Sequence, residues 1–392
     1  MPKITKRLRT VNKRRKNNTE KSTKPTNKVT KQTKPNKQTN KVVKPVKQPV
    51  KHTMKRTKKE STGISIATSR VRNVLANSIN PEIFRAMQLI NQNRPREPKP
   101  TEENPDPAPI AGTPVDNIDN EEFQTLLRQA REHCNDENPT DDADEWKLSA
   151  KLIKKLSSRL SGGLEVILAL FLDYLVEQYI VNGVHNCLQH NKAIIQLSHA
   201  LEQTEGFTDR VTLYPYVNTM NSYRVAQEYF ALVANAKQQE NETPVPKYCD
   251  FEGERFTGEE WNFESYINDL CQYVKNRLSA EQTTEEETQR YLRLHVSKDF
   301  KRFFSRLVYD IVSRFGTCLR SDIQNRNVKT VSNKIISHSI ETLHHNFGFD
   351  FQPVNSYITE HMVKYDSFIK EYKRRQSENS NEDVEDEVEY ED

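Results

Sequence analysis

The sequence predicts an all-α protein in which two similar helical units pack on each other. Residues 156–201 and 295–343 repeat one pattern: a long amphipathic segment, a short loop that contains a lysine, and a shorter helical segment. A lysine-rich segment precedes the first unit, and the chain ends in a run of acids. This composition favours a helical body between a basic and an acidic tail, both expected to be disordered.

Apolar residues three and four positions apart predict a long helix in each unit. The spaced residues are Leu164, Leu168, Phe171, Leu175 and Tyr179 in the first unit, and Phe300, Phe304, Leu307, Ile311, Phe315 and Leu319 in the second. A long helix buries such a stripe poorly alone, whereas two crossing units bury both. We expect the contact between them to contain Leu168, Phe171, Leu175, Phe304, Leu307 and Ile311. Periodicity alone equally allows a generic helical bundle or a helical repeat.

Composition divides the rest of the chain. The expected segments are a disordered lysine-rich tail (1–60), a helical region (61–93), an acidic proline-rich insert with one helix (94–145), the first unit (146–207), a connector (208–262) with a weak helical pattern around 223–236, the second unit with a C-terminal helix (263–370) and an acidic tail (371–392). Such an insert is tolerable as a surface loop.

The charge is strongly asymmetric along the chain. Residues 1–60 hold 22 Lys and Arg against two acids, a net charge of +20, which leaves −16 for the remainder because the total is +4. Prolines between lysines that lie mostly three apart favour an extended chain that can follow phosphates. The sequence therefore predicts a polyanion-binding arm, although a localisation signal or a solubilising tail would have a similar composition.

Several classes of protein and site are not indicated. The five cysteines form no CxxC pair, and the chain has no apolar signal segment and no run of eighteen apolar residues. We therefore expect an intracellular protein, neither secreted nor in a membrane. Phosphate-loop, dinucleotide, zinc-protease and nucleophile-elbow motifs are absent, so we expect no enzyme activity, cofactor, metal or small-molecule substrate. His185, His190 and His199 near Cys187 lack usual zinc spacing.

The two units resemble two different histones. The first resembles histone two-A in RLSGGLEVILALFLDYLVEQYI, in the NK and SHAL segments that follow, and upstream in SRVRNVL. The second resembles histone two-B in FESYINDLCQYVKNRL, SKDFKRFFSRLVYDIVSRF, KTVSNKII and PVNSYITEHMVKY. In this order the chain is similar to the histone doublets of nucleocytoplasmic large DNA viruses. The resemblance implies two histone folds that form an intramolecular handshake pseudo-heterodimer. Alternatively, 146–160 supplies the first helix and 64–90 lies elsewhere.

The same resemblance implies positions that contact DNA. They are Arg70 and Arg72 in the first helix, Arg159 in the first loop and Lys192 in the second loop of unit one, and Ser297, Lys298, Lys329 and Thr330 in unit two. For each of them the alternative is a solvated surface residue, and this alternative carries more weight for Lys192 than for the others. The chain also departs from the family: residues 193–195 are Ala-Ile-Ile where an arginine is usual, and of the acidic surface patch it keeps Asp173 but has Gln178 and Val181 where acids are expected.

The function implied is non-specific binding and compaction of double-stranded DNA. The resemblance implies a nucleosome-like particle, formed with a second pair resembling histones three and four, in the virion and in the host nucleus or viral factory. One alternative is a regulatory transcription subunit built on the histone fold. Another is a basic-tailed scaffold that binds nucleic acid, including RNA.

Overall fold

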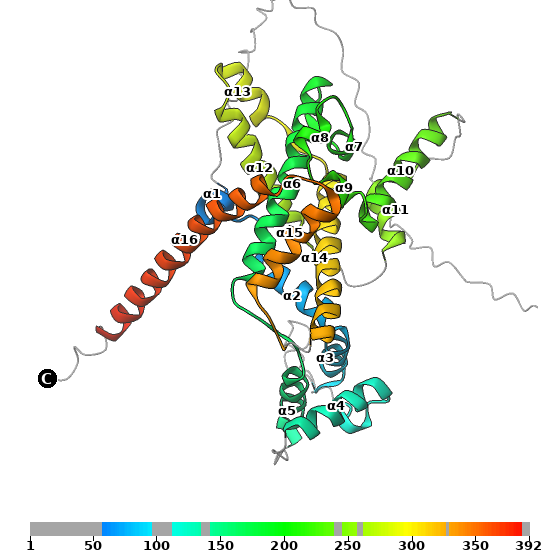
Figure 1. The fold of residues 1–392 in the computed structure, drawn as a ribbon, viewed down its shortest axis with the longest axis vertical. Helices are drawn as coiled ribbons and strands as arrows, with labels where there is room; N and C mark the ends of the chain where they lie inside the picture. The colour runs from blue at the N-terminus through cyan, green and yellow to red at the C-terminus, as the bar shows by residue number, and fades with distance from the viewer. Residues whose placement is uncertain are drawn as a thin grey trace, which may run out of the picture. The chain divides into compact units, whose positions relative to one another are not determined.

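The computed structural model describes residues 57–95, 112–134, 142–238, 245–256, 262–326 and 329–385. Within these ranges the protein is all-α, as predicted, apart from a short 3-10 turn and four two-residue strands (Figure 1). The helices up to the first long helix are α1 (Lys58–Thr62), α2 (Thr68–Ile79), α3 (Pro81–Asn93), α4 (Glu121–Cys134), α5 (Asp142–Lys155) and α6 (Leu164–Gln189). The later helices are α7 (Leu197–Leu201), α8 (Phe207–Arg210), α9 (Tyr214–Val217), α10 (Asn221–Gln238), α11 (Tyr248–Arg255), α12 (Glu264–Ala280), α13 (Glu285–Leu292), α14 (Lys298–Arg326), α15 (Asn333–Phe347) and α16 (Phe351–Glu385).

Each half of the body has a long helix with a two-residue strand at either end. In the first half, β1 (Arg159–Leu160) precedes α6 and β2 (Ile194–Ile195) follows it. In the second half, β3 (His295–Val296) precedes α14 and β4 (Thr330–Val331) follows it. Earlier in the chain, α2 precedes β1 in the first half and α12 precedes β3 in the second half, with other helices between them. After the long helix, α7 follows β2 in the first half and α15 follows β4 in the second half. The two halves therefore repeat one order of elements.

The strands pair crosswise between the halves. β1 pairs with β4 in parallel, and β2 pairs with β3 in parallel. The strand before each long helix thus lies beside the strand after the other long helix, so α6 and α14 run in opposite directions where they lie side by side (Figure 1). Each pair contains one strand from each half, so neither half can form these strand pairs alone.

One core joins the two halves. The six residues expected between the long helices, Leu168, Phe171, Leu175, Phe304, Leu307 and Ile311, are each 0% exposed. Rings from opposite halves meet there: the centroids of Phe171 and Phe315 are 6.0 Å apart, and those of Tyr179 and Phe304 are 5.6 Å apart. Edge-to-face and tilted pairs at these distances add to the burial of apolar surface.

The helix α2 of the first half lies against the long helix α14 of the second half. A Cβ added to Gly316 would come within 2.4 Å of the Cβ of Ser78 and 3.2 Å of the carbonyl oxygen of Leu75. Glycine therefore permits this close approach of the two backbones. With Val71 and Val74 also buried in the main core, α2 takes the place expected for the first helix of its half.

The segment expected as a connector contributes to the same core. Helices α8 to α11 lie within it, and three of its tyrosines, Tyr216, Tyr223 and Tyr248, are buried. The sequence pattern indicated only one weak helix there. The short helices α8 and α9 carry too few residues to show a period, which explains why the pattern missed them.

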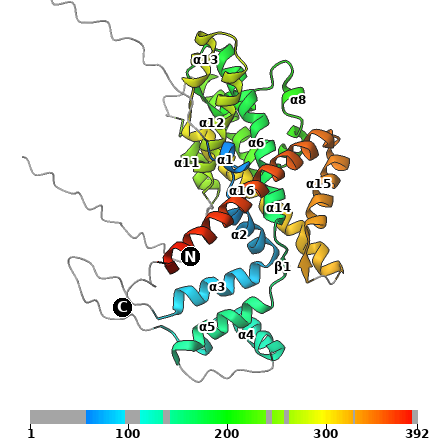
Figure 2. The same cartoon turned by 90° about the vertical axis from the view of Figure 1, so that its left-hand side faces the viewer.

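The insert and its flanks form a second, smaller core. Helices α3, α4 and α5 bury Ile83, Ile90, Phe123, Leu127, Trp146 and Ile153 against one another (Figure 2). We call α3, α4 and α5 the inserted module. This differs from the expectation, which placed one helix in the insert, residues 81–93 in the helical region before it and residues 146–155 in the first unit. The module's helices pair among themselves because each has an apolar face that the main core does not cover.

The two ends of the described chain also differ from expectation. A capping box, in which Thr57 and Glu60 satisfy each other's backbone N–H groups, starts α1, so the last residues assigned to the basic tail are helical. The acidic segment 371–392, expected to be disordered, is helical as far as Glu385. Ion pairs of Glu371 with Arg374 and Arg375 support that helix. Residues 1–56 and 386–392 of the expected tails lie outside the described ranges.

Candidate nucleic-acid interface

The pair of strands β1 and β4 builds one basic end of the body, which we call the β1–β4 end. Arg159 stands in register with Thr330, and its backbone N–H donates to the carbonyl oxygen of Lys329 at 2.9 Å. The side chains of all three residues are exposed. In the described part of the chain, Arg159 and Lys329 have no ion pair with a carboxylate. The fold therefore brings together three predicted residues that are 170 positions apart and leaves two positive charges free for a ligand.

Two helices start at this end. α6 begins after Gly163, whose φ of +88° gives the sharp turn out of β1, and α15 begins at Asn333, directly after β4. The Ser161 hydroxyl donates to Asn333 Oδ1 at 2.8 Å and holds the two starts together. Unpaired N–H groups and the helix dipole make such a position favourable for an anion such as phosphate.

Lys334 also belongs to this end, although the sequence comparison did not single it out. Its side chain is exposed in the first turn of α15, five residues after Lys329. The signal that could have found it is the KTVSNK segment itself, whose second lysine falls in the first turn of the helix that follows β4.

The two predicted arginines of α2 are engaged within the protein. Arg72 donates to Glu165 Oε2 at 3.1 Å and to the carbonyl oxygen of Leu160 at 3.0 Å, so it fixes α2 to the chain around β1. Arg70 donates to the carbonyl oxygen of Asn262, and its guanidinium lies 5.4 Å from the ring centroid of Tyr266. Arg70 therefore contacts the start of α12 and does not join either pair of strands.

The pair of strands β2 and β3 builds the β2–β3 end. Lys192 and Lys298 are exposed there. Ser297 has a structural part: its backbone N–H donates to the carbonyl oxygen of Ile195 at 3.0 Å, and its hydroxyl accepts from the N–H of Phe300 at 3.2 Å near the start of α14. Ile194, in the stretch where an arginine was expected, is 47% exposed. Arg293, two residues before β3, is exposed as well, so this end also presents free cations.

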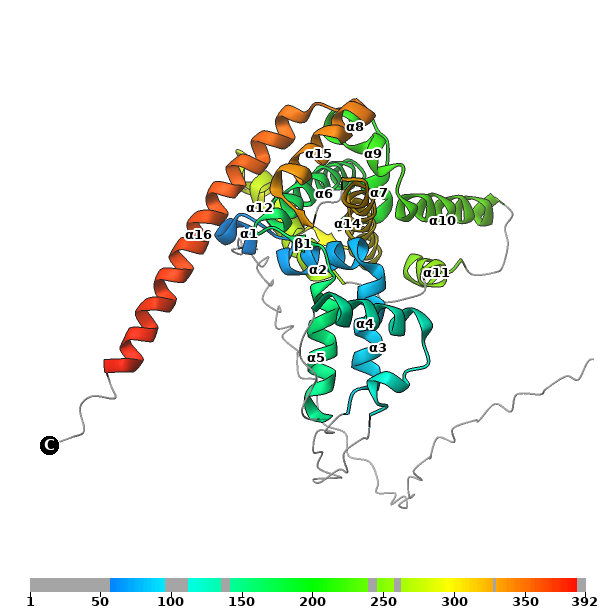
Figure 3. The same ribbon diagram turned by 60° about the horizontal axis from the view of Figure 1, so that its bottom comes forward.

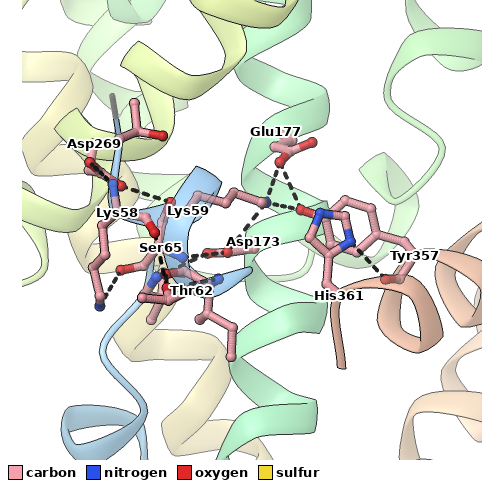
Figure 4. A network of polar contacts seen from close by, with 12 residues as sticks. Lys58, Lys59, Thr62, Ser65, Asp173, Glu177, Asp269, Tyr357 and His361 are labelled. Atoms are coloured by element: carbon pink, nitrogen blue, oxygen red, sulfur yellow. Dashed lines mark hydrogen bonds and ion pairs between the residues drawn. The ribbon is translucent and has the colours of Figure 1, made fainter. Parts of the chain in front are cut away.

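A buried polar network holds α1 against α6 (Figure 4). The Lys59 ammonium lies 3.4 Å from Asp173, and it also contacts Glu177 and the Tyr357 hydroxyl of α16. Arg277 of α12 pairs with the other oxygen of Glu177 at 3.1 Å. Four elements distant in sequence thus meet at one lysine.

The resemblance implied that Asp173 belongs to an acidic surface patch. This is wrong, because Asp173 is buried in the network. It is 0% exposed and accepts hydrogen bonds from the backbone N–H groups of Ser65 at 2.8 Å and Ile66 at 3.2 Å. Burial raises the pKa of Asp173, with Lys59 acting in the opposite direction. Burial also acts to raise the pKa of Glu177, but the charges of Lys59 and Arg277 outweigh it and the pKa of Glu177 is lowered.

His361 lies at the edge of this network. Its ring stacks on Tyr357 with centroids 4.1 Å apart, and its Nε2 atom is buried without a hydrogen-bonding partner in the described structure. Burial, with the nearby Lys59 charge, lowers the pKa of His361. The folded protein therefore favours the neutral imidazole.

This predicts that His361 makes a contribution to stability that is lost as the pH falls from about 7 to about 5. In that window the unfolded chain binds a proton at His361 and the folded chain resists it, so the free energy of unfolding decreases with decreasing pH. Burial lowers the pKa of His185 and His199 too, and both contribute with the same sign. Urea unfolding at several pH values measures the slope of the free energy of unfolding against pH. His361→Gln should make the slope shallower without removing it; an unchanged slope would contradict this role of His361.

Other kinds of site find no support in the described ranges. They contain no group of three or more His, Cys, Asp or Glu side chains placed to hold a metal ion. None of the helices described is both long enough and apolar enough to cross a bilayer. Comparison with protein-family models, curated proteins and solved structures finds no match to this chain. The inference about function therefore depends on the geometry and on the sequence resemblance.

Proposed function

We propose that the chain is a histone-fold pair in one polypeptide that binds double-stranded DNA without sequence preference and compacts it. The observation that carries the proposal is the crosswise pairing of the loop strands, β1 with β4 and β2 with β3. It supports a handshake of two helix–strand–long helix–strand–helix units, the arrangement that the resemblance to histones two-A and two-B implies. From the resemblance we also propose a partner pair resembling histones three and four, and a location in the virion and in the host nucleus or viral factory.

The chemistry of the two ends supports a role in binding phosphates. Arg159, Lys329 and Lys334 at the β1–β4 end are exposed cations beside the starts of two helices. Lysine, arginine and backbone N–H groups are the usual protein partners of DNA phosphates, and they carry no sequence information. Arginines of nucleosomal histones enter the inward-facing minor groove in the same base-independent way. The β2–β3 end, with Lys192, Arg293 and Lys298 exposed, supplies a second contact.

Replacing two of the three exposed cations of the β1–β4 end tests the proposal. In Arg159→Gln/Lys329→Gln we expect the affinity for duplex DNA to fall, and the slope of log K against log salt concentration to decrease by about 1.8, because each phosphate contact contributes about 0.9. Fluorescence anisotropy over a series of salt concentrations measures both quantities. The free energy of unfolding from urea titration should stay within about 0.5 kcal/mol of that of the unsubstituted protein, since both side chains are exposed.

A matched control removes two lysines of the body that lie away from the paired strands. Lys237 in α10 and Lys373 in α16 are both exposed. Lys237→Gln/Lys373→Gln lowers the net charge by the same amount and should leave the salt slope nearly unchanged. If the control and the Arg159→Gln/Lys329→Gln variant bind DNA equally well, the β1–β4 end is not the DNA site and the proposal is contradicted.

A further inference from the structure

The helix α5 of the inserted module presents one face of lysines. Lys147, Lys151, Lys154 and Lys155 are exposed, and their spacing places them on one side of the helix. The opposite side carries Trp146, Leu152 and Ile153, which are buried in the module's core. The lysine face is therefore fixed outward by the packing of the apolar face.

This face leads directly to the β1–β4 end. α5 ends at Lys155, and Arg159 of β1 follows after a turn of three residues. The turn is held by hydrogen bonds from the Leu156 N–H to the Ile153 carbonyl oxygen at 3.1 Å and from the Ser157 hydroxyl to the Lys154 carbonyl oxygen at 2.6 Å. Lys154 and Lys155 are thus joined to Arg159 by a short turn that hydrogen bonds hold in place.

Two further contacts tie the inserted module to the body. The Ser158 N–H donates to Asn80 Oδ1 at 3.1 Å, which joins the turn after α5 to the residue between α2 and α3. In Figure 3, α3, α4 and α5 lie together. Glu82 of α3 pairs with Arg320 of α14 at 3.0 Å. The entry and the exit of the module are therefore bound to each other, and the module is bound to the long helix of the second half.

We propose that the lysine face of α5 is an additional duplex-DNA binding surface, which continues the path of the phosphates from the β1–β4 end onto the inserted module. The inference deepens the proposed function and rests on it. From Lys147 to Lys155 the helix rises about 12 Å, enough to lie along several phosphates of one duplex. Lysines bind phosphates as point charges, so the added surface strengthens binding and lengthens the site without reading bases.

Lys154 and Lys155 carry the argument within this face. Neither makes an ion pair with a carboxylate in the described ranges, whereas Lys147 and Lys151 each have an interaction of their own. The Asp and Glu residues of α5 lie at its other end, in its first turn. The lysines without neighbouring acids in the helix are therefore the ones nearest in sequence to Arg159.

The test is Lys154→Gln/Lys155→Gln in the full chain, with DNA binding measured on a long duplex of about 40 base pairs. We expect the salt slope to fall by about 1.8 and the affinity at about 0.1 M salt to fall at least about tenfold, the effect of losing two phosphate contacts. Lys154→Arg/Lys155→Arg keeps both charges and should bind as tightly as the unsubstituted protein. Arg128→Gln, an exposed arginine of α4 in the same module, serves as a control for general charge loss.

The outcomes separate this inference from the proposed function. If Lys154→Gln/Lys155→Gln binds like the Arg128→Gln control while Arg159→Gln/Lys329→Gln binds weakly, the extension onto α5 is overturned and the proposed function stands. If none of these variants changes DNA binding, both fall. Urea unfolding is measured in parallel, because lysines in the last turn also stabilise a helix through its dipole. A loss of affinity that follows a lower unfolding midpoint, and that the arginine variant does not restore, would assign the two lysines to the stability of α5 and overturn the inference.

Discussion

Phe304→Asp is expected to unfold both halves of the body in one transition. Phe304 is fully buried in α14, and its ring meets Tyr179 of the other half at 5.6 Å and Phe300 at 4.6 Å. A carboxylate there would be buried without a partner at a cost of several kcal/mol, comparable with the whole stability of a domain, roughly 5–15 kcal/mol. Circular dichroism should show the loss of most helix, and urea titration the loss of the cooperative transition.

Two comparisons sharpen this prediction. Phe304→Ala removes the ring without adding a charge and should cost about 3–5 kcal/mol while the protein remains folded. Phe171→Asp in α6 should have the same consequence as Phe304→Asp, because Phe171 packs on Phe315 of the other half. If either aspartate variant stayed fully helical with an unchanged urea midpoint, the two halves would not share one core.

Lys59→Met is expected to lower the free energy of unfolding by about 3–5 kcal/mol. Lys59 is the cation that faces Asp173, and both side chains are 0% exposed, so the substitution leaves a buried carboxylate without its partner. Glu177 is less affected because Arg277 still pairs with it. Urea unfolding near neutral pH measures the loss.

The neighbouring lysine provides the control. Lys58 is exposed, and its ammonium donates to the carbonyl oxygen of Ser65, so Lys58→Met should cost no more than about 1 kcal/mol. The double variant Lys59→Met/Asp173→Asn should recover part of the loss, since no charge is then left unpaired. Equal losses in Lys58→Met and Lys59→Met would show that the buried network does not hold α1 in place.

Helix periodicity was sufficient to predict the two long helices. Their stripes are local patterns, and the structure confirms helices through Leu164–Gln189 and Lys298–Arg326. The crosswise pairing of β1 with β4 could not come from periodicity, because each strand has two residues and its partner lies far away in sequence. The family resemblance implied a handshake of the two halves, without naming these strands.

The inserted module and the buried network show where the sequence was insufficient. A proline-rich acidic composition concealed a small core, although its apolar residues were present in α4 and α5. Lys59 stood in a lysine-rich segment, so nothing marked it as buried. The Thr57–Glu60 capping box was a readable signal for α1, and it was the one indication that the segment becomes ordered there.

The sequence could predict which basic residues belong to the candidate site. It could not predict which of them are already paired within the protein. Arg72 and Arg159 have the same character in the sequence, yet Arg72 is paired with Glu165 and Arg159 is exposed beside Thr330. Glu165 lies 93 positions from Arg72, so only the fold could show that the guanidinium is already occupied. The sequence therefore proposes the cations, and the structure shows which of them remain free to bind.

Hydrogen–deuterium exchange of the full chain, with and without a long DNA duplex, tests the central claim most directly. The claim is that the paired strands at both ends of the body bind DNA, beyond any contribution of the lysine-rich arm. We predict slower exchange on DNA binding in residues 157–163 and 329–335 at the β1–β4 end, and in residues 190–197 and 293–300 at the β2–β3 end. Slower exchange confined to residues 1–56, with both ends unchanged, would contradict it.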